Sequence, residues 1–283
     1  MTRLIRKGAV VATPVVASTV MVLMAGVLVP LVGWLALLAW LVVLAVLLAG
    51  GGEATAARVL LGAREPHRAE VVTLGPTLEL LHAHGSGPDP RYLRVQDGIY
   101  TIRAAGTGRR TVMISDGLIA AIREGQLPPA QAAAVIAHAT GVVRSGATRN
   151  DLAVSFWTLP FQFIAAVAVG IGSVFAGLPL VSLVWRGRFV VGIVALAQGI
   201  EDGSAAGIAV GVMGAGIIAL TYAAPFWARR WGRTLTAIGD RWVQEVGMSE
   251  HLSAFLRRCP PTPDLLERIL DLDPPRMVPQ RAW

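Results

Sequence analysis

The sequence predicts a mostly helical membrane protein with about four transmembrane helices and a water-exposed part that mixes helices and strands. The 283 residues are 54% hydrophobic and only 15% charged, and their mean hydropathy is +0.59. Soluble domains usually carry about 25% charged residues, so the composition argues against an ordinary cytosolic enzyme. The charged residues also fall in blocks, and these blocks define the expected segments.

Residues 1–50 are expected to form a transmembrane hairpin. Residues 8–50 contain no Asp, Glu, Lys, Arg or His, and about 20 apolar residues are enough to cross a bilayer. Pro30 interrupts this run, which predicts spans near 9–28 and 32–50. The run is much longer than the apolar core of a signal peptide, about 7–15 residues, so we expect the hairpin to be retained.

Residues 51–151 are expected to be water-exposed, because they contain 11 Arg and 9 acidic residues. The segment begins with a predicted helix that ends near Gly85. Alternating apolar and polar residues then predict short strands, and Gly98 together with Gly106 and Gly108 indicates that hairpins join them.

Two further helices are predicted before residue 151. The first has Ser115 or Asp116 as its N-cap, since both residue types cap helices well. The second begins at Pro128 and Pro129, because proline is tolerated in the first turn of a helix.

Residues 152–228 are expected to form a second transmembrane region, and residues 229–283 a helical tail exposed to water. We place a third span inside 157–184 and a fourth at 204–227. In the fourth span small residues recur every four positions, which places them on one helical face that can pack closely against another helix or a second copy of the chain. These residues are Gly203, Gly207 and Gly211.

The basic residues predict the orientation in a prokaryotic cell membrane. Arg3, Arg6 and Lys7 precede the first span, and three more arginines directly follow the last one. Because basic residues concentrate on the cytoplasmic side, both termini and the water-exposed parts are expected in the cytoplasm. The net charge of +7 is explained by this placement, so we expect no nucleic-acid partner.

The order of these segments and four short motifs resemble the HtpX-type integral-membrane zinc peptidases, which belong to the gluzincin group. The family has two N-terminal spans, a strand unit, a zinc-binding helix, two more spans and a second site helix. The matching residues are Ile114 to Ile119 after the strands, Gln131 to Val142 on the first site helix, Thr236 to Arg241 on the second, and Cys259-Pro260-Pro261 with Arg268-Ile269 in the tail. The resemblance implies a zincin-like peptidase domain, formed by 51–151, split by the second helical hairpin and completed by 229–283.

The resemblance also implies a zinc site, but the residues that should form it are missing. The family uses two histidines four residues apart, a glutamate between them as general base, and a distant carboxylate. Here the histidine positions hold His138 and Val142, the base position holds Ala139, and the distant ligand position holds Thr236. Asp240, which supports the site in the family, is present. We therefore expect no cofactor and no catalytic residue.

Other residues offer weak alternatives. His82 and His84 point apart on a helix but share one face of an extended segment, and we expect exposed histidines without a ligand. Cys259 is the one cysteine, which excludes an internal disulfide, and a nucleophilic role would need a nearby base. The segment from Gly106 to Arg110 lacks the rest of a phosphate-binding motif, so a hairpin turn is expected. His67 and His251 need no role.

Three functions remain open at this point. The first is a non-catalytic relative of the peptidases that binds membrane or client proteins through its strand unit, since edge-strand pairing requires only backbone groups. The second is an active membrane metallopeptidase with a relocated metal site. The third is a structural membrane protein without peptide binding. The absence of charged residues within the spans argues against ion or proton transport.

Overall fold

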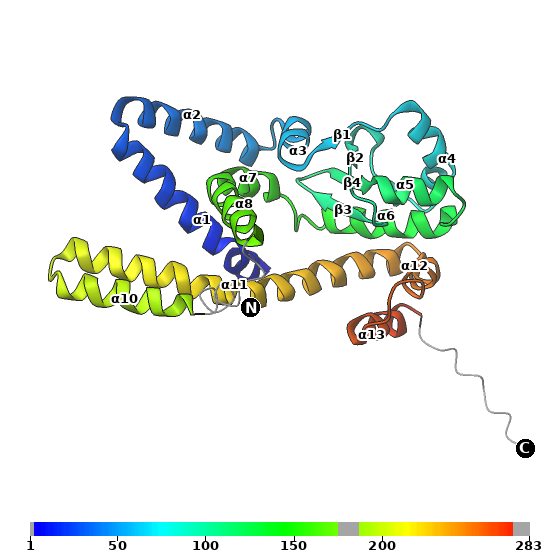
Figure 1. Ribbon diagram of the computed structural model, residues 1–283. Coiled ribbons are helices and arrows are strands. Elements are labelled where there is room, and N and C mark those ends of the chain that lie inside the picture. Colours follow the sequence, from blue (N-terminus) through cyan, green and yellow to red (C-terminus); the bar gives the residue numbers. More distant parts are fainter. Residues whose placement is uncertain (1–2, 175–186, 274–283) are drawn as a thin grey trace, which may run out of the picture. The chain divides into compact units, whose positions relative to one another are not determined.

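The computed structural model describes residues 3–174 and 187–273, and most of these residues are helical (Figure 1). The chain divides into two compact units. The first unit comprises residues 1–48 and 153–233, and the second comprises 49–152 and 234–283. The long helix α11 (Ala205–Glu245) contributes to both units, because the boundary after residue 233 lies inside it.

The first unit contains the helices that are suited to a membrane. Its elements are α1 (Arg3–Leu28), α2 (Pro30–Ala49), α7 (Asp151–Trp157), α8 (Leu159–Val174), α10 (Arg188–Glu201) and the first part of α11. Among the described residues, three segments are long and apolar enough to cross a bilayer: Lys7–Leu28, Leu31–Ala49 and part of Ala205–Glu245. The predicted third span, inside 157–184, covers α8 and then continues into residues 175–186, which lie outside the described residues.

The break predicted at Pro30 is confirmed, because α1 ends at Leu28 and α2 begins at Pro30 itself. Proline suits the first helical position because its missing N–H has no partner there in any case. Helices α7 and α8 pack against this hairpin. Trp157 donates a hydrogen bond from Nε1 to Thr19 Oγ1 at 3.1 Å.

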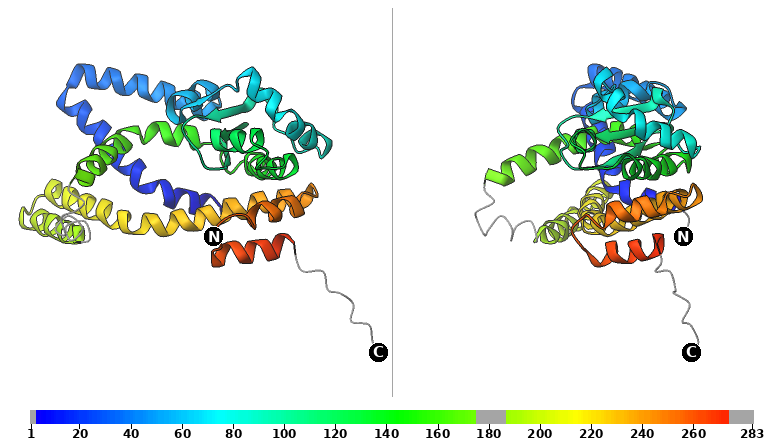
Figure 2. Two further views of the ribbon diagram at one scale, coloured as in Figure 1. Left: turned by 45° about the vertical axis from the view of Figure 1, so that its right-hand side comes forward. Right: turned by 90° about the vertical axis from the view of Figure 1, so that its right-hand side faces the viewer.

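Glycines in α11 pack against the neighbouring helix α10 of the same chain, and Figure 2 shows the two helices side by side. A Cβ at Gly211 would lie 2.7 Å from the carbonyl oxygen of Ala195, so only glycine permits this approach. The same close contact joins Gly207 to Gly199. Gly203 differs from the prediction, since it precedes α11 and has a φ of 66° in the turn after α10. Pairing between two copies of the chain through these glycines stays a prediction.

The second unit is a four-stranded sheet with helices packed against it. Its elements are α3 (Glu53–Leu61), β1 (Ala63–Arg64), α4 (Arg68–Ala83), a 3₁₀ turn η1 (Pro90–Tyr92), β2 (Leu93–Gln96), β3 (Ala104–Thr107), β4 (Thr111–Ser115), α5 (Asp116–Arg123), α6 (Pro129–Arg144), the end of α11, α12 (Ser249–Leu256) and α13 (Pro263–Leu272). The strand order is β1-β2-β4-β3.

The sheet is not the simple series of hairpins that the glycines predicted. Only β3 and β4 form a hairpin, whereas β2 lies parallel to β4. The chain passes Gly98 and crosses to the far side of β4 before β3 begins. The reason is burial: all five residues of β4 are buried, so this strand takes a central position with a neighbour on each side.

The predicted helix starts of α5 and α6 are confirmed. Ser115 is the N-cap of α5, and its hydroxyl accepts a hydrogen bond from the backbone N–H of Leu118 at 3.2 Å. Helix α6 begins at Pro129, with Pro128 as its N-cap. Nearly every residue from Ala132 to Val143 is buried, so α6 forms the centre of the core together with Leu74, Ile114 and Leu252.

The segment from Gly106 to Arg110 forms the β3–β4 hairpin turn. The backbone N–H groups of Arg109, Arg110 and Thr111 all donate to one oxygen, Glu53 Oε1, at 3.0, 3.1 and 3.1 Å. The turn therefore binds a carboxylate of its own chain. This contact fastens the start of α3 to the hairpin.

Candidate functional site

Two helices approach each other unusually closely in the second unit, and they carry the residues of the predicted site. These are α6 and the end of α11. A Cβ at Gly141 of α6 would overlap with the Cβ of Trp242, and a Cβ at Gly239 of α11 would overlap with the ring of His138. The two glycines therefore allow the helices to pack with almost no space between them, which brings position 138 next to positions 236–240.

The imidazole of His138 lies between two acceptors. Its Nε2 is 3.3 Å from the carbonyl oxygen of Thr236 and 3.4 Å from Asp240 Oδ1. Because both neighbours accept hydrogen bonds, Nε2 carries the proton and donates it. A metal ligand needs a nitrogen with a free lone pair, so Nε2 is committed to the protein instead.

Burial of the ring lowers the pKa of His138, since only 20% of its side chain is exposed. The positive charge of Arg268 lowers the pKa of this imidazole further, and Asp240 opposes both effects. His138 is therefore neutral at neutral pH and serves as a hydrogen-bond donor.

Asp240 is held by an arginine from the C-terminal helix. Arg268 of α13 donates from Nε to Oδ2 at 2.8 Å and from Nη2 to Oδ1 at 2.7 Å. Such bidentate pairs fix both groups in orientation as well as in distance. The resulting chain of contacts, Arg268–Asp240–His138, ties α13, α11 and α6 together. We call these three residues the polar triad.

Arg268 is the member of the polar triad to which the sequence analysis gave no role. It was noted only as part of the family-like pair with Ile269. A partial signal for it exists, because Arg268 lies on an amphipathic helix, beside Ile269 on the buried side. Nothing in the sequence, however, brings residues 28 positions apart into register.

The structure places the other predicted positions as follows. Thr236 contributes its main-chain carbonyl to His138, so positions 138 and 236 do converge. Ala139 is 1% exposed and lies beneath β3, where a Cβ at Gly106 would be 2.9 Å from the Ala139 carbonyl oxygen. Val142 is buried one turn further along α6. None of these three side chains ends in a group that ionises.

The residues present do not fit the zinc ion that the resemblance implies. Catalytic zinc needs three protein ligands, and here the nearest donors are one protonated nitrogen, one carboxylate bound by arginine and one backbone carbonyl. Across residues 3–174 and 187–273, no three His, Cys, Asp or Glu residues gather as a metal site would require.

The alternative residues do not form a site with this triad. His82 and His84 lie at the end of α4, where each Nδ1 contacts the carbonyl four residues earlier, Leu78 at 2.7 Å and Leu80 at 2.8 Å. Cys259 follows α12, and its thiol lies 3.9 Å from the carbonyl oxygen of Phe255. His67 has a structural role that the sequence analysis missed, since it caps the start of α4 together with Glu70.

The polar triad can orient helices and exchange hydrogen bonds, but it presents no activated nucleophile. Comparison of the chain with models of known families, with curated proteins and with solved structures finds no match. The function must therefore be inferred from the geometry of this chain itself.

Proposed function

We propose that this chain is a non-catalytic relative of the HtpX-type membrane peptidases that binds extended segments of membrane or client proteins. The observation that carries the proposal is the position of β3. This strand is at the edge of the sheet and lies directly over Ala139 of α6. A binding edge thus sits above the helix where the resemblance implies catalysis, while the polar triad takes the place of a metal.

The edge of β3 has the geometry needed to accept another strand. Ser115 donates its backbone N–H to the carbonyl of Arg103 at 3.0 Å, which makes Arg103 and Ser115 a hydrogen-bonded pair of the antiparallel ladder. Hydrogen-bonded and non-bonded pairs alternate, so Ala104 and Gly106 direct their N–H and C=O groups away from β4. Within the described residues β3 pairs only with β4, and these groups can receive a peptide strand.

Casein, an extended and largely unfolded protein, is a suitable probe of this edge. We expect full-length protein in detergent to bind fluorescein-labelled casein saturably, as measured by fluorescence anisotropy, and to release no fragments on a gel. Ala104→Pro removes an outward N–H without removing a bond to β4, because proline is tolerated where the N–H faces outward from an edge strand. We expect it to weaken casein binding about fivefold, because one lost hydrogen bond contributes about 1 kcal/mol.

Ala104→Ser is the matched control, because it keeps the N–H at the same position and should bind casein as the natural chain does. Equal casein binding by the proline and serine variants would show that casein does not bind at the edge of β3. Fragments that disappear on treatment with a chelator would favour the active-peptidase alternative, and no casein binding at all would favour a structural protein.

We further propose four transmembrane spans, with both termini and the zincin-like unit in the cytoplasm. The basic residues beside the first and last spans support this orientation. A reporter enzyme that works only in the cytoplasm should be active when fused after Gly125, in the loop between α5 and α6. The same fusion to a reporter that works only outside the cytoplasm is the control, and activity there would reverse the orientation.

A further inference from the structure

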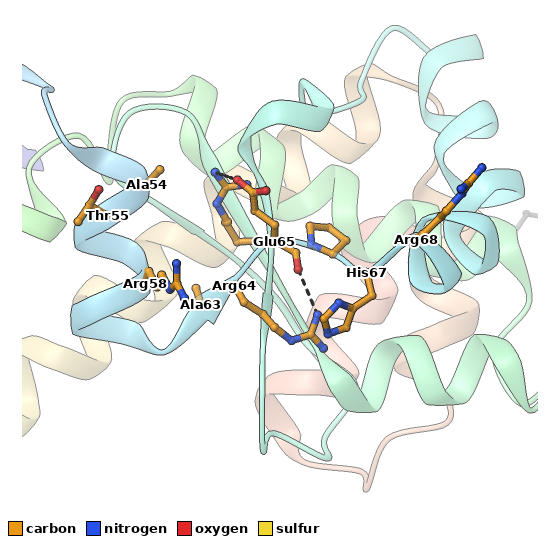
Figure 3. A pocket seen from close by; sticks show the side chains of 10 residues that line it. Ala54, Thr55, Arg58, Ala63, Arg64, Glu65, His67 and Arg68 are labelled. Atoms are coloured by element: carbon orange, nitrogen blue, oxygen red, sulfur yellow. Dashed lines mark hydrogen bonds and ion pairs between the residues drawn. The ribbon is translucent and has the colours of Figure 1, made fainter.

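A groove on the second unit is lined by four arginines and belongs to no part of the proposed peptide-binding edge. It has a volume of about 680 Å³ and is formed by α3, β1 and the start of α4 (Figure 3). Its charged lining residues are Arg58, Arg64, Arg68, Arg94 and Glu65. The size is within the range of small-molecule sites, roughly 300–1,000 Å³.

One of the four arginines is already neutralised. Arg64 forms two hydrogen bonds to the carboxylate of Glu70, both of 2.7 Å, and a third of 2.7 Å to Asp97. Hydrogen bonding from Arg64 lowers the pKa of Glu70 to about 2, against the opposing effect of burial. This arginine holds the wall of the groove together and is not available to a ligand.

A second arginine is buried with a poor partner. Only 10% of the Arg94 side chain is exposed, and its nearest carboxylate, Glu65 Oε1, lies 3.3 Å away on a side chain that is 80% exposed. Figure 3 shows Glu65 among the side chains that line the groove, and its carboxylate is the one paired with Arg94. Ion pairs with an exposed partner contribute little, whereas a buried guanidinium needs a well-fixed anion. A ligand anion could therefore replace Glu65.

The remaining two arginines have no carboxylate partner among the described residues. Arg58 is on α3 and Arg68 is the first residue of α4, and both are exposed. They lie on opposite sides of Glu65 (Figure 3). The start of α4 adds partial positive charge, because backbone N–H groups at a helix N-terminus point outward along the axis. Once Arg64 is set aside, the groove holds three arginines and a single glutamate.

We propose that this groove binds the phosphate of an anionic phospholipid headgroup. Arginine binds phosphate oxygens through two parallel hydrogen bonds. In this groove few carboxylates compete with a phosphate for the arginines. The few residues between the groove and the preceding apolar span also limit how far the groove can lie from the end of that span. The span Leu31–Ala49 ends five residues before Ala54, a lining residue, and five residues reach at most about 18 Å. Basic groups this close to the end of a span meet the headgroups of the adjoining leaflet.

The test uses full-length protein in neutral detergent and measures its melting temperature in mixed micelles. Phosphatidylglycerol should raise the melting temperature in a concentration-dependent way, because a ligand stabilises the state that it binds. Phosphatidylcholine, which has no net charge, should have a much smaller effect. Arg58→Gln with Arg68→Gln should weaken the apparent affinity for phosphatidylglycerol at least about tenfold. The control variant Arg123→Gln with Arg149→Gln removes the same amount of charge from exposed sites outside the groove. It should change the apparent affinity for phosphatidylglycerol little.

Two further measurements test the role of Glu65 and the source of the phosphate. Glu65→Gln leaves Arg94 without its competing carboxylate, so this variant should bind phosphatidylglycerol several-fold more tightly. Inorganic phosphate alone tests a soluble source of the same chemistry. An effect of free phosphate that equals that of the lipid and is lost in the groove variant would assign the site to a soluble phosphate compound and overturn the lipid headgroup. Equal losses in the groove and control variants would overturn the site altogether.

Discussion

Gly141→Ala is expected to destabilise the protein by about 2 kcal/mol, although alanine normally stabilises a helix relative to glycine. The usual gain is about 1 kcal/mol. Here the new methyl group would overlap with the Cβ of Trp242, an atom that cannot move unless α11 moves. Overpacking costs about 1–3 kcal/mol and occasionally more. Because the overlap is with an atom fixed to the backbone, we expect the upper end, about 3 kcal/mol, and subtracting the gain of about 1 kcal/mol leaves about 2 kcal/mol. The midpoint of chemical unfolding in detergent measures the change.

Gly232→Ala is the matched control for this prediction. It lies on α11, where a Cβ would meet nothing within 4 Å, so it should stabilise the protein by up to about 1 kcal/mol. Gly239→Ala, one turn before Trp242, should behave like Gly141→Ala because its methyl group would overlap with the His138 ring. If Gly141→Ala and Gly239→Ala raised the midpoint as Gly232→Ala should, the close packing of α6 on α11 would be wrong.

A triple variant that carries the zinc residues of the HtpX-type peptidases is expected to bind one equivalent of zinc. Val142→His and Thr236→Glu add two ligands to His138, and Ala139→Glu adds the missing base. The backbone of Thr236 already lies 3.3 Å from His138 Nε2, so a glutamate there starts close to the imidazole. Zinc would take the place of the proton that Nε2 donates in the natural chain, because metal binding to histidine releases a proton. Three ligands with an open fourth position are the composition of a catalytic zinc site. Elemental analysis of the purified protein after gel filtration gives the stoichiometry.

Two control variants show whether a lack of zinc binding comes from the buried glutamate at position 139 or from the arrangement of the ligand positions. Ala139 is 1% exposed, so a glutamate there is costly without metal, and the double variant Val142→His with Thr236→Glu tests binding without that cost. Adding His138→Ala to the triple variant should abolish binding. A folded double variant that takes up no zinc would mean that positions 138, 142 and 236 do not surround one point. The peptidase resemblance, and the support that it lends to peptide binding, would then be lost.

Features that depend on neighbouring residues were predictable from the sequence. The break at Pro30 follows from the backbone restriction of proline, and the cap at Ser115 from the reach of a hydroxyl to its own helix. The long apolar runs predicted membrane helices, because length and composition decide that property. The described residues contain three such helices, and the third predicted span, inside 157–184, stays a prediction.

Features that depend on distant residues were not predictable. The parallel pairing of β2 with β4 requires the chain to leave β2, form β3 and return, and glycine spacing is the same in either arrangement. The partnership of Arg268 with Asp240 depends on how α13 folds back after α12, which no local pattern fixes. The arginine groove likewise combines three separate elements, α3, β1 and α4, with Arg94 of β2. Its four arginines are unremarkable in a chain with 25 basic residues.

The contact between His138 and Thr236 has a consequence for biosynthesis. These residues are 98 positions apart, and the first unit's residues 153–233 are made between them. At about 5–20 residues per second, a ribosome needs roughly 5 to 20 s to cover that distance. During this interval α6 lacks the contacts that α12 and the end of α11 make with it in the folded chain. The second unit can be completed only after residues 153–233 of the first unit have been synthesised.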